Sequence, residues 1–456
     1  MKPNILIILI DSLRADKFHG DTKTSFTPNM DKIRKKGVYF ENYITVADGT
    51  VFVLSSLFTG LYPFRTGVTK DGYTKMDSSI ATYFSILSQQ GYHAYGCVPK
   101  IVESMGFLKD FEKNTSHTYD GFLTLSEGIG DRIINQLKPD FMKGPWIYFV
   151  HINDIHFPII PPKEFDKESF GSSQYERMVS SIDVWIGKFL EKVNLENTLV
   201  VLTADHGQYI PNITSNNNII ALEPDGSFQR TTTKLGNKIP SILQPLKKKL
   251  FFNIENIRKR IKEKKIQNLN LRPYEKRALL AQRSDTEHYL FDEKIHVPLL
   301  FFGYGVNQSK IISQQVRSID VFPTICNILS FSNPSEMIDG QSLMPLFNDL
   351  TIDELPIFLE TSPMVQVKSN DTIGIRTSNY KYFRGNNDKE KLTHLYDLTI
   401  DPLEENNLYD HKPDIVNKME SIILALKQDI VGSNADSISK EEENEINDEL
   451  RKLGYF

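Results

Sequence analysis

The chain has 456 residues, of which 40% are hydrophobic and 24% are charged, and its formal net charge is −5. A chain of this size can bury a large core, and the composition is that of an ordinary soluble enzyme with one large domain and a smaller one. The negative net charge argues against a general affinity for nucleic acid, and the two cysteines, Cys97 and Cys326, form no recognisable disulfide framework.

The chain begins with a short apolar run. Residues 5–10 are all aliphatic, follow only four leading residues and end at Asp11. This run is too short for a secretory signal and has no small-residue cleavage site after it. No other segment approaches the roughly 18 consecutive apolar residues of a membrane-spanning helix. We therefore expect the protein to be cytoplasmic.

Two apolar runs end in groups that can bind a metal ion. The first ends at Asp11, and the second, over 198–204, ends at Asp205 and His206. Continuous apolar runs are typical of strands buried on both faces of a sheet, and in open α/β sheets functional groups lie at the carboxyl ends of such strands. With the hydroxyl of Thr50, these side chains would give a four-ligand site for one divalent cation, open to a substrate oxygen. The combination indicates metal-assisted chemistry on an ester.

Nine segments along the chain have the order and composition of one known family. They lie at residues 4–16, 27–31, 40–43, 55–63, 151–158, 203–207, 291–298, 320–324 and 395–408. Through these segments the chain resembles the sulfatase branch of the alkaline phosphatase superfamily. The resemblance implies an α/β, alkaline-phosphatase-like fold, in which helices sandwich a large mixed sheet and a small C-terminal antiparallel sheet with a helix follows.

The residue at the nucleophile position of this family departs from the sulfatase pattern. Sulfatases carry a cysteine or serine followed by x-Pro-x-Arg, which directs conversion to formylglycine, whereas Thr50 is followed by Val51, Phe52, Val53 and Leu54. Formylglycine is therefore not expected. A threonine here resembles the phosphoglycerol and phosphoethanolamine transferases of the superfamily, and its hydroxyl needs a metal ion to stabilise the alkoxide. The alternative is that Thr50 only caps the helix beginning near Val51.

These features predict a metal-dependent hydrolase or transferase that acts on phosphate or sulfate esters through Thr50, with phosphate favoured. One alternative is a sulfuric ester hydrolase, a sulfatase acting on a sulfated saccharide or small ester. Another is a catalytically inactive binding protein on the same fold, although the predicted ligands Asp11, Thr50, Asp205 and His206 are all present. The expected substrate is an anionic ester, with membrane-associated and polyanionic substrates both open, and the sequence does not indicate an oligomeric state.

The ligand types bear on the identity of the metal ion. Ser12 stands where many sulfatases have a second aspartate. The loss of that acid, and the presence of His206 beside Asp205, shift the preference from calcium, which takes six to eight oxygen ligands, towards manganese or zinc. Asp16 is interpreted as a helix-start cap, as a polar partner of a ligand, or as a further ligand.

Histidines and a lysine are the predicted contacts of the anionic ester group. His156 and His288 are expected to donate to a non-bridging oxygen of the substrate or to protonate the leaving group. His151 is predicted to bind substrate, with a packing role as the alternative. Lys100 resembles the substrate lysine of the family, with its spacing displaced by one residue.

The organisation of the chain predicts two parts. Candidate strands alternate with amphipathic stretches over 4–350, which indicates an α/β catalytic domain over 1–355 with an insertion over about 209–285. Residues 356–456 are predicted to form a small α+β subdomain. Its predicted elements are strands at 372–376, 380–385 and 393–397 and helices at 414–428 and 441–456.

The insertion has an unusual charge. Residues 246–266 carry nine Lys or Arg against two Glu, with Leu250, Ile254, Ile257 and Ile261 at helical spacing, which predicts a basic amphipathic helix. In one interpretation the apolar stripe packs on the domain and the cationic face is solvated. In the other, the helix is a lid or surface for a polyanionic or membrane-associated substrate. The segment 210–237, rich in Asn, Thr and Ser, is predicted to be a mobile loop near the site.

Overall fold

The computed structural model describes most of the chain. The described residues are 2–68, 75–139, 141–215, 218–222, 244–282, 285, 287–331, 338–362, 370–428, 446 and 449. The predicted terminal helix over 441–456 lies outside them except for Ile446 and Glu449.

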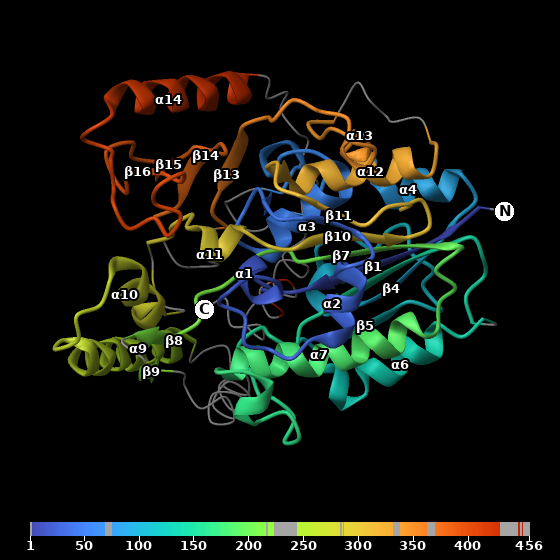
Figure 1. Cartoon of the computed structure of the whole chain (residues 1–456), viewed down its shortest axis with the longest axis horizontal. Coiled ribbons are helices and arrows are strands. Elements are labelled where there is room, and N and C mark those ends of the chain that lie inside the picture. Colours follow the sequence, from blue (N-terminus) through green and yellow to red (C-terminus); the bar gives the residue numbers. More distant parts are fainter. Residues whose placement is uncertain are drawn as a thin grey trace.

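The centre of the molecule is an eight-stranded mixed sheet (Figure 1). Its strands are β1 (Asn4–Ile10), β2 (Val38–Phe40), β4 (His93–Pro99), β5 (His117–Tyr119), β6 (Trp146–Ile152), β7 (Thr198–Thr203), β10 (Leu299–Gly303) and β11 (Lys310–Ile312). Their order across the sheet is β11-β2-β10-β7-β1-β6-β4-β5. β1 pairs in parallel with β6 on one side and with β7 on the other, while β10 is antiparallel to both β7 and β2.

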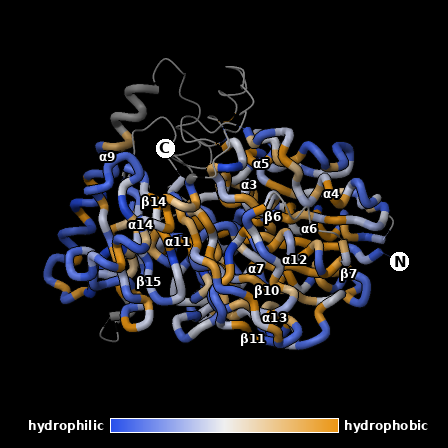
Figure 2. Tube along the Cα trace, turned by 90° about the horizontal axis from the view of Figure 1, so that it is seen from above, coloured by the Kyte–Doolittle hydropathy of each residue, from blue (hydrophilic) through white to orange (hydrophobic). Residues whose placement is uncertain are grey.

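The sequence of the central strands explains their position. Every side chain of β6 and β7 is buried, and so is every side chain of β1 after Asn4. Figure 2 shows hydrophobic segments concentrated in the interior of the larger part of the molecule. Strands that are apolar on both faces must be covered on both sides, so they lie between two layers of helices. The two apolar runs that end at Asp11 and Asp205 are confirmed as neighbouring parallel strands.

Helices cover both faces of the sheet (Figure 1). One layer contains α2 (Pro28–Arg34), α6 (Ile129–Gln136) and α7 (Gln174–Leu190); the other contains α3 (Thr50–Thr59), α4 (Tyr83–Gln89), α12 (Val321–Ile328) and α13 (Met344–Phe347). Further short elements of this part include α1 (Ala15–Phe18), β3 (Tyr43–Ile44), α5 (Lys100–Ser104), α11 (Asp292–Ile295) and β12 (Val316–Arg317). The α/β sandwich confirms the predicted fold class.

A four-stranded antiparallel sheet and a helix form the C-terminal part. They are β13 (Ile357–Glu360), β14 (Thr372–Arg376), β15 (Tyr380–Gly385), β16 (His394–Asp397) and α14 (Pro413–Gln428). This confirms the small sheet and helix that the resemblance implies. The sheet begins next to the predicted boundary at 355, but its apolar side chains form one cluster with Ile44, Tyr62 and Leu290 of the larger part. The two parts therefore share a continuous core.

The insertion forms a small layer at one end of the molecule (Figure 1). It contains a hairpin of β8 (Asn212–Ser215) and β9 (Asn218–Ala221), followed by α9 (Gln244–Ile266) and α10 (Pro273–Leu280). The predicted basic helix is confirmed by α9. The predicted loop over 210–237 is wrong where the hairpin forms, and its residues 223–237 lie outside the described ranges. A small apolar cluster joins these elements, and its buried members are Ile213, Ile266, Ala278 and Leu279.

No helix in the described ranges is both long enough and apolar enough to cross a membrane.

Candidate active site

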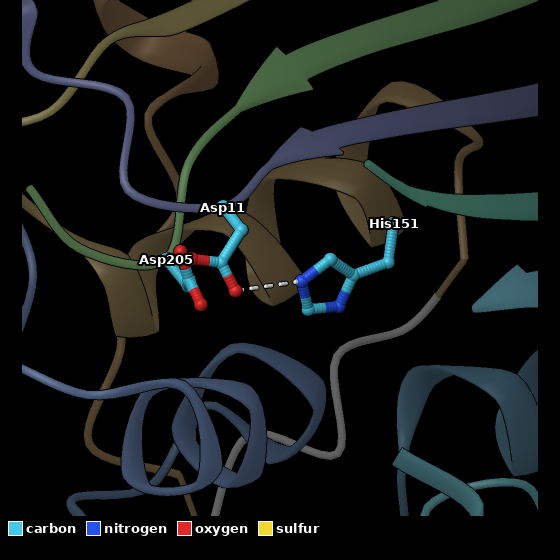
Figure 3. A group of neighbouring side chains, drawn as sticks. All are labelled: Asp11, His151 and Asp205. Carbon is cyan, nitrogen blue, oxygen red and sulfur yellow. Dashed lines mark hydrogen bonds and ion pairs between the residues drawn. The ribbon is translucent and has the colours of Figure 1, made fainter. Parts of the chain in front are cut away.

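The strand register brings three polar side chains to one edge of the large sheet. His151 on β6 and Thr203 on β7 both pair with Leu9 of β1. Side chains two residues apart along a strand point to the same face. Asp11 follows Leu9 by two residues and Asp205 follows Thr203 by two, so both should point to the side of His151. Figure 3 shows the side chains of Asp11, His151 and Asp205 close together at the ends of their strands.

These three residues form a buried group that can hold a metal ion. One ligand atom from each of Asp11, His151 and Asp205 lies within 4.8 Å of the others, and all three residues are buried. His151 Nε2 is 3.2 Å from Asp11 Oδ2. Asp205 Oδ2 has no hydrogen-bond partner among the described residues. A buried carboxylate oxygen without a partner is destabilising unless a cation neutralises it.

The electrostatics of the two acids also favour a cation. Burial, and then the negative charge of Asp11, raises the pKa of Asp205 above its ordinary value. Burial acts in the same direction on Asp11, but the hydrogen bond with His151 and the charge of His206 hold the pKa of Asp11 well below its usual range. Two buried carboxylates this close repel each other, and a positive charge between them removes the repulsion.

His206 turns a ring nitrogen towards both acids. Its Nδ1 is 2.9 Å from the carbonyl oxygen of Gly207, so Nδ1 carries the proton and donates it to that oxygen. Its Nε2 lies 3.7 Å from Asp205 Oδ2 and 3.8 Å from Asp11 Oδ1. Burial lowers the pKa of His206, but the charges of Asp205 and Asp11 outweigh burial and raise it overall. A nitrogen lone pair that faces two carboxylates requires a proton or a metal ion between them.

Thr50 is the first residue of α3, and its hydroxyl joins this group. Thr50 Oγ1 donates a hydrogen bond to Asp11 Oδ2 at 3.3 Å and lies 3.3 Å from His206 Nε2. The N-cap of α3 is Gly49, which makes no side-chain cap hydrogen bond. The interpretation of Thr50 as a helix cap is therefore wrong, because the residue stands inside the helix and its side chain contacts the acid and the histidine.

Ser12 donates hydrogen bonds to both Asp11 and Asp205. From the sequence, its position was interpreted only as the loss of an aspartate that many sulfatases have there. Its Oγ donates to Asp11 Oδ1 at 2.7 Å, and its backbone N–H donates to Asp205 Oδ1 at 3.2 Å. The φ angle of Ser12 is 63°, which is uncommon for a residue with a side chain. This backbone conformation directs both donors of Ser12 at the acids, and the two carboxylates are fixed relative to each other.

Five side chains therefore offer donors for one divalent cation, and we name them the ligand group: Asp11, Thr50, His151, Asp205 and His206. The four predicted ligands lie together, and their binding of a metal ion stays a prediction. His151 does not have the predicted substrate-binding position, because it is 1% exposed and lies against Asp11. His151 lies near the end of an apolar strand, as Asp11 does, and this position could have indicated from the sequence that His151 is a ligand.

A pocket of about 850 Å³ borders the ligand group. Ser12, Gly49 and His206 are among its lining residues, and the predicted substrate contacts His156 and His288 line it as well. Other lining residues come from the insertion and from the C-terminal part, including Asn256, Lys259, Pro273, Arg277, His394, Tyr396 and Glu405. The pocket therefore extends from the sheet edge into a space that the insertion and the small sheet enclose.

The two pocket histidines make the same kind of hydrogen bond to a backbone carbonyl. His156 Nδ1 is 3.0 Å from the carbonyl oxygen of Phe157, and His288 Nδ1 is 3.2 Å from that of Ser362. Burial, and then the charge of Lys294, lowers the pKa of His288 below its ordinary value. Neutral His288 donates through Nδ1, so its Nε2 is a proton acceptor. This environment favours a base as the role of His288, and its predicted role as a proton donor to the substrate stays a prediction.

Lys294 is a pocket cation that the sequence reasoning missed. It lines the pocket and forms an ion pair with the buried carboxylate of Asp48, two residues before Thr50. Asp48 Oδ1 also accepts a hydrogen bond from the backbone N–H of Ser362 at 2.7 Å. Gly49 allows this close packing, since a Cβ at Gly49 would lie 2.5 Å from Ser362 Oγ. Lys294 falls within the family segment 291–298, which was the available signal.

Two further predicted positions have other surroundings. Lys100 is exposed at the start of α5 and is absent from the described lining of the pocket, so its predicted substrate contact does not match its place. Asp16 accepts hydrogen bonds from Arg14 Nε at 2.8 Å and from Arg14 Nη2 at 2.9 Å. Burial opposes ionisation of Asp16, but the charge of Arg14 outweighs it and lowers the pKa to about 2. Asp16 is thus a partner of Arg14.

Family comparisons agree with this architecture. The family model described as Sulfatase matches residues 3–330. A second model, described as N-sulphoglucosamine sulphohydrolase, C-terminal, matches residues 285–434. The chain belongs to the sulfatase family, which confirms the resemblance seen in the sequence.

Individual relatives are distant. The chain is 21% identical to the choline-sulfatase of Rhizobium meliloti (strain 1021) over 456 residues, which cover 90% of this chain and 83% of that protein. It is 26% identical to arylsulfatase K of Canis lupus familiaris over 144 residues, which are 29% of this chain and only 27% of that protein. Among solved structures, phosphonate monoester hydrolase of Agrobacterium radiobacter has a TM-score of 0.64 at 15% identity and covers 96% of this chain and 99% of that one. This last likeness shows the fold.

Proposed function

We propose that this protein is a metal-dependent hydrolase of sulfate esters, with the ester group bound where the ligand group meets the pocket. The observation that carries the proposal is the buried Oδ2 of Asp205, which has no hydrogen-bond partner among the described residues and lies 3.7 Å from His206 Nε2. Membership of the sulfatase family supports sulfate as the ester class.

The ligand group fits one divalent cation by its chemistry. It offers two carboxylates, two imidazoles and one hydroxyl, and this mixture suits manganese or zinc better than calcium, which prefers oxygen ligands only. A bound cation of this kind would lower the pKa of a hydroxyl and stabilise negative charge on ester oxygens.

Thr50 provides the attacking oxygen in the proposed reaction. Its hydroxyl donates a hydrogen bond to Asp11 Oδ2 at 3.3 Å, so this carboxylate can accept its proton. As Thr50 Oγ1 bonds to sulfur, the bond between sulfur and the leaving alcohol oxygen breaks, and that oxygen takes up a proton. Water then cleaves the new bond, which releases sulfate and restores the threonine hydroxyl. The N-terminus of α3 at Thr50 adds a positive end of a helix dipole near the anionic ester.

The pocket residues have complementary tasks in this proposal. The ammonium group of Lys294 attracts the anionic ester towards the sheet edge. The ion pair with Asp48 fixes the position of this ammonium group. His156 is the proposed proton donor to the leaving oxygen. His288 is the proposed base for the water that completes the reaction, because its environment disfavours the charged imidazole.

A second candidate is a hydrolase or transferase of phosphate esters. The specific observation in its favour is that Thr50 is followed by Val51, Phe52, Val53 and Leu54, without the proline and arginine of the formylglycine pattern. A threonine oxygen attacks phosphorus by the same in-line geometry as sulfur, since both centres are tetrahedral anions. The likeness to a solved phosphonate monoester hydrolase supports this candidate at the level of fold.

The experiment that separates these candidates is a substrate panel on protein loaded with manganese or zinc. Turnover of p-nitrophenyl sulfate is compared with turnover of mono- and bis-p-nitrophenyl phosphate. We expect the sulfate ester to be the better substrate and Asp205→Asn to abolish its turnover. Turnover of phosphate esters alone would replace the proposal with the second candidate. A metal-loaded protein that turns over none of the three esters would favour the inactive binding protein.

A further inference from the structure

α9 presents an apolar stripe to solvent. Ile254, Ile257 and Ile261 are spaced three and four residues apart, so they share one face of the helix. They are 41%, 57% and 50% exposed, respectively. A surface helix normally turns its aliphatic face towards the core. The interpretation in which this stripe packs on the domain is therefore wrong for the three isoleucines, while the side chain of Leu250 lies outside the described residues.

The opposite side of α9 holds the helix on the protein. Glu255 is buried there, and so is Ile266, which joins the apolar cluster of the insertion. Lys259 Nζ forms an ion pair with Asp285 Oδ1 at 2.9 Å, and Lys262 Nζ donates to the carbonyl oxygen of Ala281 at 3.1 Å. Lys259 and Lys262 thus bind the inward side of α9 to the protein, and the isoleucine stripe faces outward.

The exposed side of α9 also carries cations. Arg260, Lys264 and Lys265 are exposed, and no acidic residue in the described part of the chain forms an ion pair with them. The helix has nine Lys or Arg and two Glu, a net charge of +7 in a chain whose formal net charge is −5. Positive charge is therefore concentrated on this one element, against the sign of the whole protein.

We propose that α9 is a docking helix that lies on the surface of an anionic lipid bilayer. The isoleucines would enter the boundary between headgroups and acyl chains, while the exposed cations pair with anionic headgroups. A soluble polyanion would need the cations alone and would leave three exposed isoleucines without a role, which is why a lipid surface fits better. This proposal does not depend on which ester the pocket cleaves.

The position of α9 links docking to the pocket. Asn256 and Lys259, on the inward side of the same helix, line the pocket. One helix therefore has a side in the pocket and a side that binds the bilayer. Docking would hold the pocket within one helix diameter, about 10 Å, of the lipid surface.

The test is co-sedimentation of the full chain with vesicles of phosphatidylcholine, with and without phosphatidylglycerol. We expect binding to the anionic vesicles only, and weaker binding as the salt concentration rises. Two variants, Ile257→Ser/Ile261→Ser and Arg260→Glu/Lys264→Glu/Lys265→Glu, should each weaken this binding by about tenfold or more. Both should keep wild-type turnover of p-nitrophenyl esters, which shows that they fold.

A matched control makes the same charge change elsewhere. Lys32, Lys35 and Lys36 are exposed at the end of α2, so Lys32→Glu/Lys35→Glu/Lys36→Glu should bind anionic vesicles like the wild type. Failure of the wild type to bind anionic vesicles would overturn the proposal, and so would unchanged binding by the isoleucine variant. Binding of heparin without binding of vesicles would assign the surface to a soluble polyanion instead.

Discussion

Replacing Asp205 by asparagine removes one negative charge from the ligand group and preserves the shape of the side chain. Two effects of opposite sign follow. In metal-free protein, the substitution relieves the repulsion between Asp205 and Asp11, whose ligand atoms lie within 4.8 Å of each other. The stability of metal-free protein should therefore stay the same or rise. In metal-loaded protein, the substitution removes an attraction to the bound cation, so metal affinity should fall.

Coulomb's law gives the size of the loss. At about 4 Å and an effective dielectric constant of about 20, two unit charges interact by about 4 kcal/mol. A divalent cation would lose up to about 8 kcal/mol of attraction to Asp205. The repulsion between Asp205 and Asp11 is present with and without the metal ion, so its relief does not change the affinity. The loss corresponds to metal binding that is weaker by roughly a thousandfold or more.

The assay is calorimetric titration with manganese and with zinc, together with thermal unfolding in the presence of a chelator. Asp183→Asn is the matched control, because Asp183 is also a buried aspartate but lies on α7 and accepts hydrogen bonds from Asn29 and Met30. The control should keep wild-type metal affinity. Wild-type affinity in Asp205→Asn would refute the assignment. A large loss of stability in chelator would instead give Asp205 a structural role.

Three further predictions concern the reaction and the pocket. Thr50→Ala should reduce turnover by several orders of magnitude while Thr50→Ser keeps measurable turnover, because only the alanine variant lacks the attacking oxygen; steady-state rates on metal-loaded protein check this. Burial raises the pKa of Asp154 to about 7, so the folded state holds this proton more tightly than the unfolded state and loses up to about 4 kcal/mol of stability as pH rises from about 4 to above 7. Asp154→Asn should therefore raise the melting temperature at alkaline pH and change it little at acidic pH, as thermal unfolding at several pH values would show. His288→Ala should lower turnover by roughly a hundredfold or more and remove the acidic limb of the pH–rate profile, which a wild-type-like profile in the variant would contradict.

The parts of the site that could be predicted from the sequence are those that strand geometry determines. Apolar runs that stop at Asp11 and at Asp205 and His206 are typical of buried strands, and the carboxyl ends of parallel neighbours meet at one edge of a sheet. The position of Thr50 followed from its spacing to the segment at 55–63. The fold class followed from the same alternation of strands and amphipathic stretches and from the family resemblance.

Other parts depend on contacts between segments that are distant in the sequence. His151 was assigned to the substrate because it lies in the family segment at 151–158. Its partner Asp11 is 140 residues away, and only the strand register shows that the two side chains meet. The missed role of Lys294 depends on Asp48, which is likewise distant in the sequence. Helical spacing identified α9 but could not show which way its stripe faces, since that depends on the partners of Lys259 and Lys262.

The most direct test of the central claim, that Thr50 attacks an ester at the metal-loaded ligand group, is accurate-mass spectrometry of protein quenched during turnover of p-nitrophenyl sulfate. The account predicts a sulfuryl group on the peptide that contains Thr50 in the wild type. It also predicts no such group in Thr50→Ala or Asp205→Asn. An unmodified peptide from actively turning-over wild type, together with wild-type turnover by Thr50→Ala, would contradict the account.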